Sequence, residues 1–182
     1  RLSYPRYFFD FQGIDFPVPQ WKGLRPYETA PFQWSCHIER STDCFEHAEF
    51  LDLTGDDPSL PCIEEMQQVI DPYDRGPIIV YNASYEKTRL RDLAERHPEY
   101  AELSDIYQAR LFDLQTVVKE HYYHPSMEGS FSLKAVLPAI APELDYAGLD
   151  EVQDGSAVVE ASDPARVGRA ESTDHRRDRA RE

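Results

Sequence analysis

Two short apolar runs, far apart in the sequence, each lead into a polar segment that carries a carboxylate. The first, Tyr7 to Phe9, leads directly into Asp10, and the second, Ile78 to Tyr81, leads into the segment that holds Glu86. A continuous apolar run is typical of a strand covered on both faces by helices. Two anions at neighbouring strand ends repel each other unless a cation neutralises them. The pattern therefore predicts an α/β sheet with a divalent-metal site at one edge.

The sequence between and after these runs predicts further strands and helices. Phe32 to Ile38 alternates apolar and polar residues, which is typical of a strand with one buried face. Apolar residues at three- and four-residue spacing predict several helices downstream. The further elements expected are strands over 32–38 and 45–53, helices over 60–70, 84–97 and 99–123 with a candidate break near 112–113, and a helix that begins at Ser130 or Ser132.

Length and composition place the chain among soluble single domains. It has 182 residues with 41% apolar content, and no run approaches the roughly 20 apolar residues of a membrane span. The start at Arg1, without an initiator methionine, predicts a fragment of a larger protein. Three cysteines without a C-x-x-C spacing favour free thiols, two of them buried, in a reducing compartment, so we expect the cytoplasm.

The acidic charge of the chain lies in its globular part. The formal net charge is -15, while the segment from Glu160 to Glu182 contains six acids and six arginines and contributes about nothing. Few large apolar residues occur in this segment, so residues 161–182 are expected to form a disordered charged tail behind a domain over residues 1–160. An acidic surface repels nucleic acid unless metal ions, a local basic strip or a neighbouring domain supplies the attraction.

Several motifs resemble known families. Phe8 to Gln12 resembles the first motif, Asp-x-Glu, of the DEDD superfamily of metal-dependent exonucleases, and Val80 to Glu86 resembles the second motif, an asparagine followed four residues later by an acid. More narrowly, an ordered set of motifs over about residues 7 to 160 is similar to the bacterial domain-of-unknown-function family numbered 2779. These motifs are Arg25-Pro26-Tyr27, Pro31-Phe32-Gln33, Tyr81 to Lys87, His121-Tyr122-Tyr123, Gly129 to Lys134 and Val136-Leu137-Pro138.

The resemblance implies a fold and an activity. The fold would be a ribonuclease-H-like mixed sheet, with three antiparallel strands and then a parallel central strand, flanked by helices. The activity would be 3′-to-5′ exonuclease-like hydrolysis of DNA or RNA, with single strands as the expected substrate. A tethered or associated RecB- or Cas4-like nuclease domain is the implied partner, and no membrane is implied. Such chemistry uses two Mg²⁺ or Mn²⁺ ions held by several carboxylates.

The resemblance also implies roles for individual acids. Asp10 would bridge both metal ions, Glu86 would hold one of them directly or through water, and Asp154 would complete the set. The His or Tyr that precedes the third-motif acid in the superfamily falls at Leu149 or Asp150, and neither fits. If the site exists, the carboxyl groups should converge within about 5 to 6 Å.

Gln12 departs from the superfamily, which has a glutamate at this position. An amide offers a metal ion a neutral oxygen without charge or basicity. Three explanations stay open: this copy is naturally weakened, a Glu→Gln change was introduced to trap substrate, or another acid such as Asp15 or Asp113 substitutes. The alternative hypothesis is a catalytically degenerate domain that keeps the fold as a nucleic-acid or protein binding module.

Four residues outside the acid set are candidates for substrate contact, and each has a simpler structural explanation. Asn82, or Ser84, can cap the helix that follows. Lys87 flanks Glu86 together with Arg89 and Arg91, which could equally form a solvated helix face. Lys134 is similarly undecided. Trp21 looks free to stack on an unpaired base, whereas Trp34 lies on the apolar side of its strand and is expected in the core.

Overall fold

The computed structural model of the chain describes residues 2–144. The expected domain boundary near residue 160, the expected charged tail and Asp154 all lie outside the described residues. Within the described part, none of the helices is both long and apolar enough to cross a membrane.

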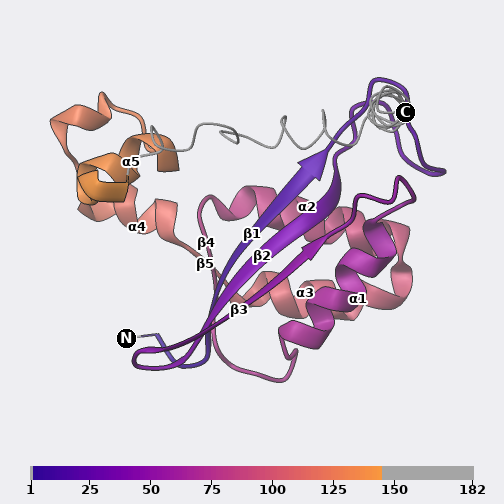
Figure 1. The fold of residues 1–182 in the computed structure, drawn as a ribbon, viewed down its shortest axis with the longest axis horizontal. Coiled ribbons are helices and arrows are strands. Elements are labelled where there is room, and N and C mark those ends of the chain that lie inside the picture. The colour runs from indigo at the N-terminus through magenta and orange to yellow at the C-terminus, as the bar shows by residue number, and fades with distance from the viewer. Residues whose placement is uncertain (1, 145–182) are drawn as a thin grey trace, which may run out of the picture. The chain divides into compact units, whose positions relative to one another are not determined.

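One mixed sheet organises the described part of the chain (Figure 1). Its strands are β1 (Arg6–Ile14), β2 (Ala30–Ser41), β3 (Cys44–Leu51), β4 (Ile78–Val80) and β5 (Leu111–Asp113), in the spatial order β3-β2-β1-β4-β5. The β3-β2 and β2-β1 pairs are antiparallel, and the β1-β4 and β4-β5 pairs are parallel. The predictions of a mixed α/β fold, and of a first strand that pairs with the fourth, are confirmed.

Helices follow the strands at the positions that the apolar periodicity predicts, with one exception. The α-helices are α1 (Ser59–Val69), α2 (Ala83–Arg96), α3 (Ala101–Arg110), α4 (Leu114–His121) and α5 (Leu133–Ile140), and short 3₁₀ helices occupy Pro98–Tyr100, Pro125–Met127 and Pro142–Leu144. Helices α1 and α2 contact the sheet, and α3 packs against α2 (Figure 1). The α4 and α5 helices continue the chain beyond β5.

The exception is the helix expected over residues 99–123. Helix α3 ends at Arg110, and the three residues of β5 then pair with β4, with Ile78 opposite Leu111 and Val80 opposite Asp113. The expectation of one long helix was wrong, although the candidate break lay at the right place. Because β5 has only three residues and no flanking glycine or proline, a periodicity argument cannot separate it from the neighbouring helices.

The hydrophobic core lies between one face of the sheet and helices α1, α2 and α3. Alternate residues of β1 and β2 point into it, because successive side chains of a strand face opposite sides. The largest of these core side chains are Tyr7, Phe9, Phe11 and Trp34 from the strands and Ile63, Met66, Leu90, Leu93 and Tyr107 from the helices. Burying such a side chain contributes about 1.5 to 3 kcal/mol.

Two predictions about this core are confirmed. Trp34 is buried, with its indole Nε1 donating a hydrogen bond of 3.1 Å to the Cys62 carbonyl oxygen. Cys36 and Cys62 are free buried thiols, and Cys44 is free and exposed. Since β1 directs its odd-numbered residues Tyr7 to Phe11 into the core, Asp10 and Gln12 project from the opposite face of the strand.

Candidate active site

Asp10 lies at the level where the neighbouring strand β4 ends. Phe8 pairs with Ile79, so the chain leaves β4 beside Asp10 and turns there into α2. The Asp10 side chain is exposed, and its Oδ2 accepts a hydrogen bond of 2.7 Å from Gln12 Nε2. Desolvation by the surrounding protein raises the pKa of Asp10, and the Gln12 hydrogen bond lowers it. The expectation that Asp10 ends its strand was wrong, because β1 continues to Ile14; Asp10 lies within the strand with an amide as its immediate partner.

Glu86 is a buried carboxylate one turn into α2. Only 2% of its surface is exposed, as expected for a residue on the face of α2 that points toward the sheet. Its Oε2 atom is buried without a hydrogen-bond partner. Burial, together with the negative charges of Asp10 and Asp113, raises the pKa of Glu86 to about 7, against the opposing effects of a backbone hydrogen bond and the charge of Arg89. A carboxylate in this state gains most from a cation.

Asp113 adds a third acid close enough to act on Glu86 electrostatically. It ends β5, and because β4 and β5 are parallel, it lies at the same edge of the sheet as the end of β4. Its Oδ1 accepts hydrogen bonds from the backbone N–H of Asn82 (3.0 Å) and of Gln115 (2.9 Å). Burial tends to raise the pKa of Asp113, but the backbone N–H donors hold it below its ordinary value. Asp113 therefore stays ionised and also caps α4.

The α2 helix begins in a way that the sequence did not predict. Asn82 occupies the N-cap position with φ 69° and ψ 71°, in the left-handed region, and no side chain caps the helix. Ser84 Oγ instead donates a hydrogen bond of 2.5 Å to Asn82 Oδ1. Asn82 is thus the N-cap residue by position, but the expected side-chain cap is absent, because the Asn82 and Ser84 side chains bond each other while the Asn82 N–H bonds Asp113.

The oxygen atoms near this edge of the sheet are of the types that bind a hard divalent cation. Mg²⁺ and Mn²⁺ prefer carboxylate and carbonyl oxygens, which Asp10, Glu86 and the Gln12 amide provide. The orphaned Glu86 Oε2 is an oxygen donor that lacks a partner. Across residues 2–144, however, no three histidine, cysteine, aspartate or glutamate side chains are gathered closely enough to hold a metal ion. Asp154, the expected third ligand, lies outside this range.

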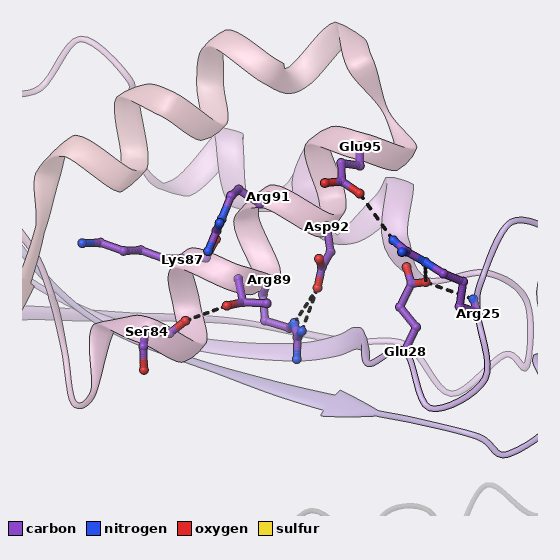
Figure 2. A network of polar contacts seen from close by, with 9 residues as sticks. Arg25, Glu28, Ser84, Lys87, Arg89, Arg91, Asp92 and Glu95 are labelled. Carbon is purple, nitrogen blue, oxygen red and sulfur yellow. Dashed lines mark hydrogen bonds and ion pairs between the residues drawn. The ribbon is translucent and has the colours of Figure 1, made fainter.

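The candidates for substrate contact lie in different parts of the structure. Lys87 is exposed on α2 and extends away from the Arg89–Asp92 pair (Figure 2). Lys134 is exposed on α5, and Asp15, the other acid considered as a substitute for Gln12, is exposed one residue beyond β1. The structure therefore bonds Gln12 to Asp10, puts Asp10 and Asp113 near enough to raise the pKa of Glu86, and places the lysines on separate helices.

Trp21 is held by structural contacts. Its Nε1 donates a hydrogen bond of 3.0 Å to the Gly55 carbonyl oxygen, and its ring packs edge-on against Phe16 with 5.8 Å between centroids. These contacts do not test the expectation that Trp21 stacks on a base, which stays a prediction. The indole ties the loop between β1 and β2 to the segment between β3 and α1.

Two residues near the acids were not singled out as a pair by the sequence. Tyr85 directly precedes Glu86, and Arg89 follows one turn later with only 8% of its surface exposed. Arg89 had been considered as part of a solvated face, but it is buried and bonded to Asp92. The available signal was the helical spacing itself, because a residue three positions after an inward-pointing glutamate lies on nearly the same face.

Comparison with known proteins gives a family and a distant relative. The family described as Domain of unknown function (DUF2779) matches residues 7–132, which confirms the narrower of the two resemblances. The chain is 26% identical over 153 residues to the Uncharacterized protein UU173 of Ureaplasma parvum serovar 3 (strain ATCC 700970). That alignment covers 79% of the chain and 22% of the relative, so the chain spans about a fifth of the relative's length. No solved structure matches the chain.

Proposed function

The chain belongs to the family described as Domain of unknown function (DUF2779), and from that premise we propose that it is a divalent-metal-dependent phosphodiesterase domain. The proposed reaction is 3′-to-5′ exonuclease-like hydrolysis of single-stranded DNA or RNA. The strand order β3-β2-β1-β4-β5, with β4 and β5 parallel to β1, supports a ribonuclease-H-like fold. In open sheets with parallel strands, ligands bind outside the carboxyl ends of the strands; Asp113 ends β5, and Asp10 lies beside the end of β4.

The state of Glu86 is the observation that carries the proposal. An ionised carboxylate inside a protein costs several kcal/mol unless it is paired. Glu86 has a buried oxygen without a partner, and the charges of two further acids raise its pKa. A purely structural role would be served as well by glutamine or leucine at this place. A cation-binding role accounts for the unpaired acid, since a divalent ion would supply the missing positive charge.

Each residue of the proposed site would have its own role in holding the metal ion or in positioning a ligand. Asp10 and Glu86 would hold Mg²⁺ or Mn²⁺, with Asp154 as the proposed third ligand and Gln12 able to offer only its amide oxygen. When bound, the ion or ion pair supplies charge neutralisation and polarises the phosphodiester. Asp113 holds the start of α2 through the Asn82 N–H and so positions Glu86 at the strand ends.

The proposal extends to cellular context. The acidic surface requires that nucleic acid be brought by metal ions or by a neighbouring domain, and a tethered or associated RecB- or Cas4-like nuclease domain is the proposed source of basic surface. The share of the distant relative that lies outside the alignment leaves room for such a domain. The free buried thiols support a reducing compartment, so the cytoplasm is the proposed location.

A degradation assay with three proteins tests the proposal. Labelled single-stranded DNA and RNA are incubated with Mn²⁺ and the unmodified chain, Gln12→Glu, or Gln12→Glu combined with Asp10→Ala. We expect Gln12→Glu to cleave faster than the unmodified chain, because it adds a charged ligand beside Asp10. Loss of cleavage on adding Asp10→Ala ties the activity to this site. Absence of cleavage in all three proteins, with Mn²⁺ binding also absent, contradicts the proposal.

One observation favours a second function, a catalytically degenerate domain that binds nucleic acid or protein. The Gln12 amide donates its hydrogen bond to Asp10 and satisfies this carboxylate without any ion. A domain that had lost its metal could be stabilised by such a bond. Retained binding of labelled single strands, without cleavage by either the unmodified chain or Gln12→Glu, supports this second function.

A further inference from the structure

We propose that His37 and His47 form a binding site for a divalent transition-metal ion, such as Zn²⁺, on the face of the sheet opposite the core. The two imidazoles would supply both protein ligands, and water would complete the coordination. This site is separate from the metal site of the proposed function and does not depend on it. Three features carry the inference: the pairing of β2 with β3, the stacking of the two rings, and the charge of their surroundings.

The register of the sheet places the two histidines opposite each other. His37 of β2 and His47 of β3 are directly paired in the antiparallel ladder. Directly opposed residues of such a pair have Cβ atoms about 4.5 to 5.5 Å apart on one face of the sheet. Cys36 and Ile38, the neighbours of His37 in β2, are buried in the core. His37 therefore lies on the opposite face with His47, and both are exposed.

The two rings are close enough to share one ion. Their centroids lie 4.3 Å apart, and their planes are inclined by 31°. Imidazole nitrogens bind Zn²⁺ at about 2.0 to 2.1 Å, so two of them on one tetrahedral ion lie about 3.3 Å apart. Because the χ2 torsion of histidine has a broad range, a modest rotation of each ring can direct one nitrogen from each at a common point.

Ser35 supports His47 as the neighbours of metal-binding histidines do. Its Oγ lies 3.0 Å from His47 Nε2, and when Nε2 carries the proton, the imidazole donates to this hydroxyl. The lone pair of His47 is then on Nδ1 and free for a metal ion. Ligating histidines donate their other ring N–H to a neighbouring group, which fixes the tautomer and the orientation of the ring. Ser35 therefore acts as a positioning residue for His47.

The side chains next to the histidines are acidic. Asp10 of β1 and Glu49 of β3 both lie opposite Ser35, two residues along the strands from the histidine pair and on the same face. Both are exposed, and their negative charges raise the local concentration of cations. Imidazole suits Zn²⁺, Cu²⁺ and Ni²⁺, whereas carboxylates suit Mg²⁺ and Mn²⁺. The histidine pair therefore selects a different class of ion from the acids.

Two protein ligands make an exchangeable site. Within residues 2–144, no third histidine, cysteine, aspartate or glutamate joins the pair to form a larger group that could hold a metal ion. Structural zinc sites have four protein ligands, and catalytic zinc sites have three and an open position. An ion held by His37 and His47 keeps more positions open than either. We therefore expect an ion that binds and leaves, and not a permanent structural centre.

Titration calorimetry with zinc chloride tests the site. It is carried out on the 182-residue chain, His37→Phe, His47→Phe and the double variant. Phenylalanine keeps an aromatic ring on the strand and removes the ligating nitrogens. We expect each single variant to bind Zn²⁺ about tenfold or more weakly, because the second imidazole acts on an ion that the first already holds nearby. The double variant should lose little more than either single variant, since the two ligands act as one unit.

Two further variants show where the ion binds. His121→Phe is the matched control, because it removes an exposed histidine from α4, and it should bind Zn²⁺ as the unmodified chain does. Asp10→Ala should also keep its Zn²⁺ affinity, since Asp10 is not a ligand of the pair. In the unmodified chain, one equivalent of Zn²⁺ should shift the ring C–H resonances of His37 and His47 together in nuclear magnetic resonance spectra.

The contrary results are equally specific. Equal Zn²⁺ affinity of the unmodified chain and His37→Phe overturns the site, and so does a shift of only one of the two rings. Loss of Zn²⁺ binding in Asp10→Ala places the ion at the carboxylates and also overturns it. An equal loss in His121→Phe points to unspecific binding and has the same consequence. None of these results depends on Mn²⁺, so the proposed function and this site can fail independently.

Discussion

Gln12 Nε2 donates a hydrogen bond of 2.7 Å to Asp10 Oδ2, so the proposed first-motif acid is bonded to the amide two residues further along β1. The two side chains lie two residues apart on the same face of β1. A glutamate at residue 12 would place a second negative charge where a donor now neutralises part of the first. With glutamine at residue 12, Asp10 is partly neutralised without any ion. With glutamate there, the two negative charges would favour a bound cation.

Gln12→Glu should lower stability without metal and raise affinity for metal. Two exposed like charges about 4 Å apart repel by about 1 kcal/mol in water, so we expect the free energy of unfolding to fall by about that amount in chelator. The same charge adds an anionic ligand, so Mn²⁺ should bind more tightly and restore the lost stability. Urea unfolding with chelator and with Mn²⁺ measures both effects.

Gln67→Glu is the matched control for this change, because it adds the same charge on the exposed side of α1. We expect its stability to respond to Mn²⁺ as the unmodified chain does. A Gln12→Glu protein that gains nothing from Mn²⁺ beyond this control would show that the sheet edge does not hold the ion.

The burial of Glu86 predicts a pH-dependent loss of stability. Its pKa is about 7 in the folded chain, raised by burial, against an ordinary value of 4.5. Below pH 4.5 both states hold the proton. As the pH rises toward 7, the unfolded chain releases it first, so the stability of the folded chain falls, by about 1.4 kcal/mol per pH unit and about 3 kcal/mol in all.

Glu86→Gln should remove most of this dependence, because the amide stays neutral. The unmodified chain and Glu86→Gln should differ by about 3 kcal/mol more at pH 8 than at pH 4.5, as measured by urea unfolding in chelator. Glu65→Gln on the exposed face of α1 provides the control and should follow the unmodified chain at both pH values. Parallel pH profiles for the unmodified chain and Glu86→Gln would contradict the buried, unpaired state of this acid.

Asp113→Ala should destabilise the N-terminal ends of α2 and α4, because the Asp113 carboxylate accepts a hydrogen bond from a backbone N–H at each of them. Removing an N-cap acid costs about 1 kcal/mol, and here the Asn82 N–H at the start of α2 also loses its acceptor. Because the pKa of Asp113 is lowered in the folded chain, its contribution is present above its ordinary value of 3.8 and is lost as the pH falls further.

Denaturant unfolding at pH 7 and pH 3 measures this contribution. We expect Asp113→Ala to be less stable than the unmodified chain at pH 7 and the difference to shrink at pH 3. Asp105→Ala, at an exposed position of α3, is the comparison variant and should show little change at either pH. A deficit of Asp113→Ala that is the same at both pH values would mean that the carboxylate charge is not what holds the two helix starts.

The parts of the fold that the sequence predicted are those with a long or unbroken apolar pattern. The continuous run at Ile78 to Val80 became an interior strand of the sheet, and the alternation around Trp34 became β2 with that indole in the core. Glu86, Leu90 and Leu93 recur at the three- and four-residue spacing of one helical face, and all three are buried. In each case local periodicity and tertiary burial agree.

The parts that the sequence did not predict depend on contacts between distant residues. The strand β5 exists because β4 offers it a pairing edge, and only this pairing brings Asp113 to the N–H of Asn82. Asn82 itself adopts a left-handed conformation. Trp21 is bonded to Gly55, which is 34 residues away in sequence. None of these relationships leaves a periodic signal in one sequence.

The close approach of Gly13 to Tyr85 can be measured without any assumption about activity. Gly13 lies next to the Thr29 side chain as well as the Tyr85 hydroxyl, so a methyl group there meets two neighbours. Thr29→Ser removes the Thr29 Cγ2 methyl and leaves the Tyr85 hydroxyl as the main side-chain obstacle. In this background, the loss of stability caused by Gly13→Ala reports how closely the Tyr85 hydroxyl approaches Gly13.

In the Thr29→Ser background, Gly13→Ala should destabilise the chain by about 1 to 3 kcal/mol, the usual cost of inserting a methyl group into a filled space. Adding Tyr85→Phe removes the Oη atom that the new methyl meets, so the cost should fall, with a coupling energy of about 0.5 kcal/mol or more in the double-mutant cycle. Urea unfolding of the four proteins gives this energy, and Tyr100→Phe in place of Tyr85→Phe should give none. If Gly13→Ala costs the same with tyrosine and with phenylalanine at residue 85, the hydroxyl does not lie against β1 at Gly13.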